Sequence, residues 1–335
     1  MTPKVSVCIT FCDKDFHLIK TLLSHIENNI KVSYEVLLYD NREKDNSDLN
    51  IHNYEILGQN GKNEFQLKAK SELIKNAKGE YIWFVDADDD ICFIPKRLES
   101  LTFNIVSFGA YFGKEIQHTK SGIFKINYDN TIGYTGGQLW DKWIKSDLLK
   151  QFVDIIKDKE MICGEDVFLY ILALEKEKLI EYNPTIIYKY NLENSSSYSK
   201  SYKGFESFKG ILKRDRLKDM AYKYCNNNWL KETKFDLYLE HEPVYLFNFL
   251  KKDNKDDWKK LADEITQRYS EQELLISYSV FFDTNIWYKD GFKFIKKYLI
   301  EKYPNAFTNQ NIIATQKLYN KTQVFIRFEK DEEEI

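Results

Sequence analysis

The sequence predicts an α/β protein, with a mostly parallel sheet flanked by helices in residues 1–200 and a mostly helical region in residues 201–335. Three observations predict this class. Apolar segments of strand length alternate with segments of helical spacing over the first third of the chain. Several strand-length segments are apolar at nearly every position, as expected for parallel strands that are covered on both faces. Beyond about residue 200, apolar side chains recur mainly at helical spacing.

Composition and charge exclude several classes of protein. Of the 335 residues, 43% are hydrophobic and 30% are charged, a balance typical of folded globular domains. The formal net charge of −3 argues against a generally basic nucleic-acid binder. The 5 cysteines are odd in number and lack C-x-x-C spacing, which argues against a disulfide framework or a zinc ribbon. No segment approaches the roughly 18 apolar residues of a membrane span. We therefore expect a cytoplasmic protein, either free or at the inner face of the membrane.

The first elements form a strand–helix–strand unit. Residues 5–11 are a nearly continuous apolar run and predict a buried strand. Asp13 and Asp15 follow it and are candidates to cap the next helix. Residues 35–40 predict the second strand, and residues 54–57 predict a weak third. The helix between the first two strands is predicted from the spacing of Leu18, Leu22, Leu23 and Ile26.

The alternation of strands and helices continues beyond these elements. Residues 67–77 predict a helix, with Gly79 at its C′ position as the terminator. Residues 81–85 predict a strand that runs into an acidic segment. Because ligands bind at the carboxyl ends of the strands in such sheets, Asp40 and Asp86 mark the expected binding edge. Further on we predict, in order, a strand at 103–112, a glycine-rich turn at 133–137, a helix at 167–174 and a strand at 185–190.

Apolar positions predict three helical faces in residues 201–335. The third face, within residues 292–303, stands opposite a lysine-rich face. A core-facing helix with a solvated back is the favoured interpretation, and contact with an anionic membrane is the alternative. The three faces consist of Phe205, Phe208, Leu212, Met220 and Tyr224, then Trp258, Leu261, Ala262, Ile265 and Tyr269, then Phe292, Ile295, Tyr298, Leu299 and Tyr303.

Four aspartates directly follow the predicted strand at residues 81–85. Carboxylates this close repel one another and require compensation, which a hard divalent cation with oxygen ligands supplies. Such a cation would also neutralise the oxygens of a bound diphosphate. The alternative is a solvated acidic turn, in which the last aspartate caps a helix entered near Ile94. The four residues are Asp86, Asp88, Asp89 and Asp90.

Two further acidic positions are candidates for binding and catalysis. Asp40 ends the second predicted strand, where its carboxylate can accept the imide N–H of uracil or cap the loop backbone. Glu165 and Asp166 stand directly before the predicted helix at 167–174. Acids at a helix N-terminus are commonly partners of the helix dipole. The same position also suits a base that a helix holds rigidly in a cleft.

Five short segments occur in a fixed order that adds to these signals. They are residues 6–10 (SVCIT), 35–40 (EVLLYD), 77–89 (AKGEYIWFVDADD), 140–142 (WDK) and 164–166 (GED). Together they resemble the inverting family-2 glycosyltransferases with the GT-A fold, over about residues 4–200. The sequence departs from the family where it carries Lys70 and Ser71 in place of a frequent Arg-Asn pair, and Asp141 where Asn is common.

The resemblance implies a GT-A type nucleotide-diphospho-sugar transferase fold and transfer of a sugar from a nucleotide-diphosphate donor, with a UDP-sugar expected. The acceptor would be a hydroxyl of a glycan, glycolipid or glycoprotein, in a bacterial surface-glycan setting by analogy alone. The resemblance also implies Mn²⁺ or Mg²⁺ held by Asp86 and Asp88, and Asp166 as the general base. The implied donor-binding residues are Thr10, Phe11, Asp40, Lys70, Asp86, Ala87 and Asp88. The implied acceptor-binding residues are Trp140, Asp141, Lys142 and Glu165.

Two other functions compete with this prediction. A metal-dependent sugar nucleotidyltransferase also uses acidic residues on a doubly wound sheet, but the sequence lacks a glycine-rich, basic N-terminal phosphate loop. A non-catalytic carbohydrate-binding or scaffold protein on a transferase fold is expected to lose Asp86, Asp88 or Asp166, and all three are present. The catalytic interpretation is therefore favoured.

Overall fold

The computed structural model describes most of the first 191 residues and several helical segments beyond them. The described residues divide into two compact units. The first takes in those up to Asn191, apart from residues 132–136 and Met161, and the second takes in these exceptions and the residues from Arg214 onward. The described ranges are 2–43, 54–58, 66–161, 164–191, 214–226, 228–231, 239–240, 243, 255–282 and 289–322.

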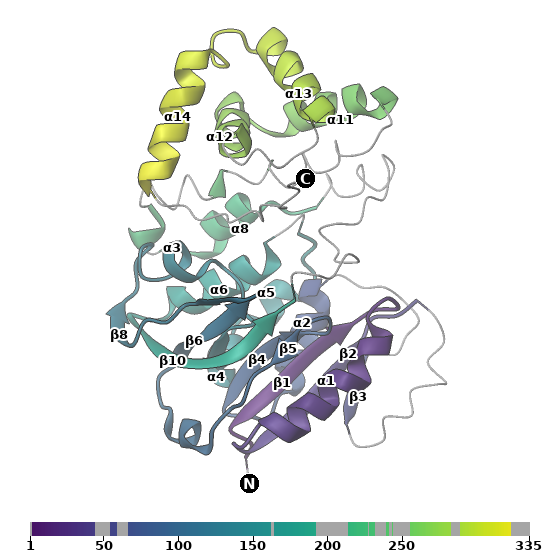
Figure 1. Ribbon diagram of the computed structural model, residues 1–335, viewed down its shortest axis with the longest axis vertical. Coiled ribbons are helices and arrows are strands. Elements are labelled where there is room, and N and C mark those ends of the chain that lie inside the picture. Colours follow the sequence, from purple (N-terminus) through teal and green to yellow (C-terminus); the bar gives the residue numbers. More distant parts are fainter. Residues whose placement is uncertain are drawn as a thin grey trace. The chain divides into compact units, whose positions relative to one another are not determined.

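Among the described residues, ten strands of the first unit form one mixed sheet (Figure 1). The strand order is β3-β2-β1-β4-β9-β6-β10-β5, with β7 paired to β6 and β8 paired to β10. The four strands from β3 to β4 are parallel neighbours, whereas β9 runs antiparallel between β4 and β6. The predicted mostly parallel sheet is thus confirmed. The strands are β1 (Val5–Phe11), β2 (Tyr34–Asp40), β3 (Glu55–Leu57), β4 (Tyr81–Asp86), β5 (Asp90–Ile91), β6 (Ile105–Phe112), β7 (Glu115–Gln117), β8 (Gly122–Lys125), β9 (Lys142–Lys145) and β10 (Leu179–Tyr190).

Helices flank this sheet, as the alternating pattern predicts. The crossovers from β1 to β2 and from β3 to β4 run in opposite directions across the sheet. Right-handed connections therefore put their helices, α1 and α2, on opposite faces. On the α1 side, Val5, Val7 and Ile9 pack in one hydrophobic cluster with Ile19 and Leu22. The helices in residues 1–191 are α1 (Phe16–Asn29), α2 (Gln66–Asn76), the 3₁₀ helix η1 (Lys96–Ser100), α3 (Ile132–Thr135), α4 (Ser146–Lys150), α5 (Val153–Ile156) and α6 (Glu165–Glu175).

The predicted aspartate caps have other roles in the structure. Helix α1 begins after Asp15, but the Asp15 carboxylate makes no cap bond and instead accepts the Sγ–H of Cys12 at 3.0 Å. Asp13 accepts a backbone N–H beyond the end of β2 at 3.0 Å. Asp90 belongs to β5 and lies 2.6 Å from the Nδ1 atom of His25, so it caps no helix. The cap predictions are wrong because these side chains find partners outside the helices that follow them.

Two glycine predictions also change. Helix α2 ends at Asn76, and Gly79 does not adopt the left-handed backbone of a C′ glycine. A Cβ atom at Gly79 would instead lie 2.5 Å from the backbone nitrogen of Ser6, so the close approach of β1 requires the glycine. The predicted turn at 133–137 contains the short helix α3, after which Gly136 has a φ of 68°.

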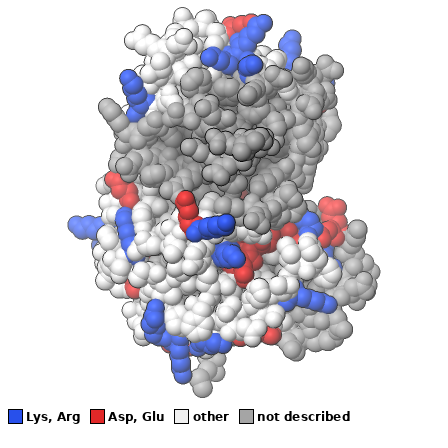
Figure 2. All heavy atoms as spheres, viewed as in Figure 1, with Lys and Arg blue, Asp and Glu red and all other residues white. Residues whose placement is uncertain are grey.

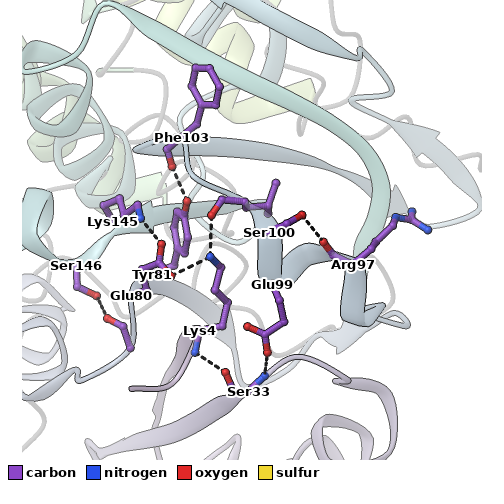
Figure 3. Close-up of polar contacts among 12 residues, drawn as sticks. Lys4, Ser33, Glu80, Tyr81, Arg97, Glu99, Ser100, Phe103, Lys145 and Ser146 are labelled. Atoms are coloured by element: carbon purple, nitrogen blue, oxygen red, sulfur yellow. Dashed lines mark hydrogen bonds and ion pairs between the residues drawn. The ribbon is translucent and has the colours of Figure 1, made fainter. Parts of the chain in front are cut away.

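A polar cluster surrounds the amino end of β4, and Figure 3 shows its members pointing toward one another. The Lys4 ammonium lies 2.8 Å from a carboxylate oxygen of Glu80 and 2.7 Å from the carbonyl oxygen of Leu101. Lys145 forms an ion pair with the second oxygen of Glu80. Both ammonium groups also lie over the ring of Tyr81, at 5.0 and 4.6 Å from its centroid. We call Lys4, Glu80, Tyr81 and Lys145 the amino-end cluster.

The second unit is mostly helical in its described residues, which include α3. Helix α11 contacts α13, and α12 contacts α14. The second predicted face is buried throughout, from Trp258 to Tyr269. Of the first predicted face, Phe205, Phe208 and Leu212 lie outside the described residues. The helices that the structure describes beyond residue 191 are α8 (Leu217–Tyr224), the 3₁₀ helix η3 (Asn228–Lys231), α11 (Lys255–Arg268), α12 (Glu271–Phe282), α13 (Lys289–Lys302) and α14 (Asn309–Thr322).

The apolar face of α13 packs against α11. Ile295 and Leu299 are fully buried, and the ring of Phe294 lies 5.7 Å from that of Trp258. These contacts support the core-facing interpretation of residues 292–303. No helix in the described ranges is long and apolar enough to cross a bilayer.

Candidate active site

Strands β1, β2 and β4 end side by side and form the expected binding edge. In the sheet register, Phe11 of β1 is paired with Asp40 of β2, and Thr10 of β1 is paired with Asp86 of β4. Phe11 and Asp40 are buried, Thr10 is half-buried, and Asp86 is exposed. The predicted donor residues from three separate segments therefore meet at one edge of the sheet.

The acidic turn, residues 86–90, is fixed by strand β10 and the residue that follows it. The Tyr188 hydroxyl donates to a carboxylate oxygen of Asp89 at 2.6 Å and accepts the backbone N–H of Asp86 at 3.1 Å. The backbone N–H of Asn191 donates to the other Asp89 oxygen at 2.8 Å. Burial raises the pKa of Asp89 to about 7, although the bonds from Tyr188 and Asn191 act to lower it. The turn conformation thus depends on a residue about one hundred positions away.

Several carboxylates converge on Asp86. Desolvation by the surrounding protein raises the pKa of Asp86 well above its ordinary value, although the residue keeps contact with solvent. Repulsion from Asp89, Asp166 and Asp88 raises it further, and attraction to Lys70 opposes these effects. Asp86 at the end of β4 and Asp166 in α6 therefore act on each other electrostatically.

Lys70 joins α2 to the start of α6. Its Nζ atom lies 2.6 Å from Oδ1 of Asp166, and its side chain is 9% exposed, against 27% for Asp166. Burial alone lowers the pKa of Lys70, but attraction to Asp166, Glu165 and Asp86 raises it above its usual value. The ammonium is thus charged and tightly paired. The predicted donor residue Lys70 and the predicted base Asp166 are direct partners.

Glu165 and Asp166 belong to the first turn of α6 rather than to the loop before it. Gly164 precedes them with a φ of 73°, a left-handed conformation that favours glycine. The carbonyl oxygen of Gly164 accepts the backbone N–H of Phe168 at 2.8 Å, which begins the helical bonding. The partial positive charge of the helix N-terminus stabilises carboxylates at this position.

The predicted acceptor residues Asp141 and Lys142 are buried beneath the edge. The Lys142 ammonium lies 2.6 Å from one carboxylate oxygen of Asp141, and Nδ1 of His118 lies 2.8 Å from the other. Lys142 also donates to the carbonyl oxygen of Gln138 at 2.7 Å and lies over the ring of Tyr170. Because both side chains are fully buried, they have no direct access to a bound molecule in this conformation.

Trp140 lies in an aromatic stack. Its ring is 4.8 Å from that of Tyr188 and 5.9 Å from that of Tyr190, and the residue is 6% exposed. His118 stacks on it at 6.2 Å. The Trp83 indole donates to the carbonyl oxygen of Trp140 at 2.5 Å. The stack connects the acceptor segment to β10 and thereby to the acidic turn.

Asp40 is paired with Arg42 at the end of β2. The Nε and terminal nitrogens of Arg42 donate to the two oxygens of Asp40 at 3.0 and 2.9 Å. The Arg42 guanidinium also lies 4.1 Å from the ring centroid of Phe16 and 5.8 Å from that of Phe11. The Asp40 side chain is fully buried in this arrangement. A nucleobase can reach this carboxylate only if Arg42 moves.

Sequence reasoning missed the residues that hold the predicted ones in place. Tyr188, Asn191 and His118 carried no local signal, because their acidic partners lie 23 to about one hundred residues away in the chain. Arg42 follows Asp40 by two residues, so its proximity was visible, but the bidentate pairing was not. Ala87, another predicted donor residue, is buried in the acidic turn.

The carboxylates suit a metal that is bound partly by substrate. No group of three or more His, Cys, Asp or Glu side chains with metal-site geometry occurs among the described residues. Asp86 and Asp88 lie on the same turn, and the repulsion that raises the pKa of Asp86 would be relieved by a cation. Mg²⁺-type ions are commonly held by one or two carboxylates together with substrate phosphates. The residues present therefore fit such an ion.

Charges of both signs are distributed over the visible face of the molecule. Figure 2 shows both Lys and Arg side chains and Asp and Glu side chains among the described residues of this face. This distribution agrees with the formal net charge of −3.

Comparison with known families gives a match over part of the chain. Residues 6–135 match the family model described as "Glycosyl transferase family 2". This segment contains the ends of β1, β2 and β4, the acidic turn and Lys70. The match confirms the resemblance for the three segments at residues 6–10, 35–40 and 77–89. The segments at 140–142 and 164–166 lie outside it. No curated protein matches the chain in sequence.

The fold is shared with solved structures of TarS from S. aureus. TarS 1–349 in complex with UDP-GlcNAc matches with a TM-score of 0.61 at 17% identity, over 97% of this chain and 94% of that one. TarS 1–349 in complex with UDP matches with a TM-score of 0.55 at 16% identity, over 98% and 94%. A further TarS structure matches with a TM-score of 0.55 at 17% identity. That match covers 94% of this chain and 55% of the TarS chain. The predicted GT-A type fold with C-terminal helices is confirmed.

Proposed function

We propose that this chain, whose residues 6–135 match the family model of the family-2 glycosyltransferases, transfers a sugar from a UDP-sugar to an acceptor hydroxyl, with a divalent metal and with inversion at the anomeric carbon. The observation that carries this proposal is the convergence of Asp86, at the end of β4, with Lys70 and Asp166. One edge of the sheet thus combines groups suited to a diphosphate with a carboxylate suited to proton transfer.

The donor is proposed to lie along the ends of β1, β2 and β4. Thr10 and Phe11 would line its nucleoside side, and Asp40 would contact the base after Arg42 shifts. The complexes of TarS with UDP-GlcNAc and with UDP support a uridine diphosphate donor for a chain of this fold. The backbone of Ala87 would follow the diphosphate between Asp86 and Asp88.

The metal is proposed to be Mn²⁺ or Mg²⁺, held by Asp86 and Asp88. When bound, the ion would stabilise the negative charge that develops on the leaving diphosphate. Asp89 would keep the turn in shape through Tyr188 and Asn191, since both of its oxygens are engaged there. In this proposal Asp86 and Asp88 bind the metal, and Asp89 holds the conformation of the turn.

Asp166 is proposed to accept the proton of the acceptor hydroxyl as this oxygen attacks the anomeric carbon. The first turn of α6 holds the carboxylate rigidly at a helix N-terminus, a position suited to a general base. Attack from the face opposite the leaving diphosphate requires one base and inverts the anomeric centre. A retaining mechanism through a covalent intermediate would instead require a second carboxylate as nucleophile.

The acceptor is proposed to be a hydroxyl of a glycan, glycolipid or glycoprotein that approaches past Glu165. Asp141 and Lys142 would act as positioning residues from below, because they are buried and paired with each other and with His118. Trp140 would fix the same segment through its stack on Tyr188. Contact with a membrane surface stays a proposal for the second unit, and it would have to use surfaces other than the buried face of α13.

A donor-hydrolysis screen tests this proposal. The protein is incubated with a panel of nucleotide sugars, with Mn²⁺ or with EDTA, and the released nucleotide is measured. We expect release from a UDP-sugar with Mn²⁺, little release in EDTA, and loss of release in Asp166→Asn. Pyrophosphate release from a nucleoside triphosphate and a sugar phosphate would instead favour the nucleotidyltransferase. Binding of sugars without turnover of any donor would favour a carbohydrate-binding protein.

A further inference from the structure

Lys70 lies at the junction between the proposed donor site and the proposed base. Its side chain is 9% exposed, and its Nζ atom lies 2.6 Å from Oδ1 of Asp166. The ammonium also lies 5.8 Å from the ring centroid of Phe84, two residues before the acidic turn. A buried ammonium requires an anionic partner, because losing its hydration is costly. In this structure that partner is the proposed base.

Lys70 also interacts electrostatically with a carboxylate of the proposed donor site, Asp86. Burial lowers the pKa of Lys70, but Asp166, Glu165 and Asp86 together raise it above its usual value. Asp86 is the carboxylate proposed to face the donor diphosphate. Lys70 is therefore within electrostatic reach of both sites, and its three N–H donors allow it to change partners.

We propose that Lys70 couples the two sites by exchanging partners: it holds Asp166 while the donor site is empty, and a bound diphosphate draws its ammonium away and frees the carboxylate to act as base. This inference rests on the proposed function. It assigns Lys70 as a positioning residue for Asp166 in addition to a donor contact.

The exchange follows from the bonding capacity of the groups involved. A carboxylate oxygen that shares a short ion pair with an ammonium is a poorer acceptor for a hydroxyl proton, because its lone pair is already engaged. A diphosphate offers Lys70 more negative charge than a single carboxylate does. Asp166 and the diphosphate therefore compete for one ammonium. Removing the charge of Asp166 should leave Lys70 free for the diphosphate and strengthen nucleotide binding.

Titration calorimetry of UDP binding in Mn²⁺ tests this competition in the full-length chain. The wild type is compared with Asp166→Asn, Lys70→Met and the double variant, with uridine as a ligand that lacks phosphates. We expect Asp166→Asn to bind UDP about threefold to tenfold more tightly than the wild type, with uridine binding unchanged. In the Lys70→Met background, Asp166→Asn should tighten UDP binding much less, because only the weaker repulsion between Asp166 and Asp86 is then relieved.

Two further variants separate this coupling from a general charge effect. Glu165→Gln removes an adjacent carboxylate of the same helix turn that forms no ion pair with Lys70 in this structure, so its effect on UDP binding should be smaller than that of Asp166→Asn. Lys70→Arg keeps a cation and should retain most of the coupling. It should also retain more of the wild-type UDP affinity than Lys70→Met does, because the exchange requires a cation that can bind the diphosphate.

The outcomes distinguish this inference from the proposed function. UDP affinity that is unchanged or weaker in Asp166→Asn would overturn the exchange. So would tightening by Asp166→Asn that is equal in the wild-type and Lys70→Met backgrounds. If Lys70→Met does not fold, the comparison of Asp166→Asn with the wild type still tests whether loss of the Asp166 charge tightens or weakens UDP binding. Absence of UDP binding in the wild type would instead overturn the proposed donor.

Discussion

Strand β4 has charged groups at both ends, and the two ends differ in how these charges are balanced. At the amino end, Glu80 has Lys4 on one carboxylate oxygen and Lys145 on the other. Burial alone would raise the pKa of Glu80, but these bonds hold it below its usual value. The amino-end cluster therefore satisfies its own charges within the protein.

At the carboxyl end, carboxylates outnumber the nearby cation. The pKa of Asp86 is raised well above its ordinary value by desolvation and by Asp89 and Asp166. Lys70 is bound to Asp166 and opposes this effect only in part. A folded chain that keeps such an imbalance on one strand end carries a cost in stability, which ligand binding can offset. The amino end of β4 is therefore a structural polar cluster, whereas the charge imbalance at the carboxyl end is suited to binding a ligand.

The largest effect expected at the carboxyl end is on turnover. Asp166→Asn keeps the shape of the side chain but removes the proton acceptor. Turnover should fall by a factor on the order of 10² to 10⁴, measured as sugar transfer or donor hydrolysis. Glu165→Gln is the matched control and should be milder. If Glu165→Gln abolishes turnover and Asp166→Asn retains it, the two acids exchange roles.

The next effect concerns the metal. UDP should bind at least about tenfold more weakly in EDTA than in Mn²⁺, because the carboxylates of the acidic turn would otherwise repel the diphosphate. Asp88→Asn should remove most of this difference in titration calorimetry. Asp90→Asn is the control from the same turn, because Asp90 is paired with His25, and it should keep the metal response. Equal affinity with and without metal in the wild type would exclude the metal role.

At the amino end we expect a loss of stability without a loss of activity. Lys4→Met removes an ammonium that is 5% exposed and bonded to Glu80 and to the carbonyl oxygen of Leu101. The free energy of unfolding should fall by about 1–3 kcal/mol, as for buried hydrogen bonds to charged groups, measured by denaturant titration. Donor hydrolysis by the folded variant should stay near the wild-type rate. A marked loss of turnover at full folding would break the distinction between the two ends.

The smallest effect on function is expected from Asp89, which should make stability depend on pH. Its pKa in the folded protein, about 7, is above the value of about 3.9 in an unfolded chain. Folding thus favours the protonated form, so Asp89 lowers the free energy of unfolding as the pH rises from about 4 to about 7. At about 1.36 kcal/mol per pKa unit, the wild type should lose about 4 kcal/mol of stability relative to Asp89→Asn over this range. Denaturant titrations of both proteins across it provide the measurement, and parallel curves would contradict the assignment.

Much of the fold was predictable because the strands around the site are nearly continuous apolar runs. Residues 5–11 and 81–85 become β1 and β4, and the acids that follow them lie at the same edge. The caps at Asp13 and Asp15 were predicted wrongly, because a local signal cannot tell whether a carboxylate will find a partner elsewhere. Gly79 was wrongly predicted to be the C′ residue of α2, because its need for a small side chain comes from the close approach of Ser6 on a neighbouring strand.

The sequence by itself determined which chemical groups are present and which strand ends carry them. Hydrophobic periodicity sets the register of each strand and helix, and a parallel sheet then places Asp40 and Asp86 at one edge. Only the tertiary structure decided how these charges are paired: Arg42 on Asp40, Lys70 on Asp166, and His118 and Lys142 on Asp141. Lys70 and His118 reach their partners from segments far away in the chain. Electrostatic energy depends on distance and burial, and neither is fixed until the sheet and its helices have packed.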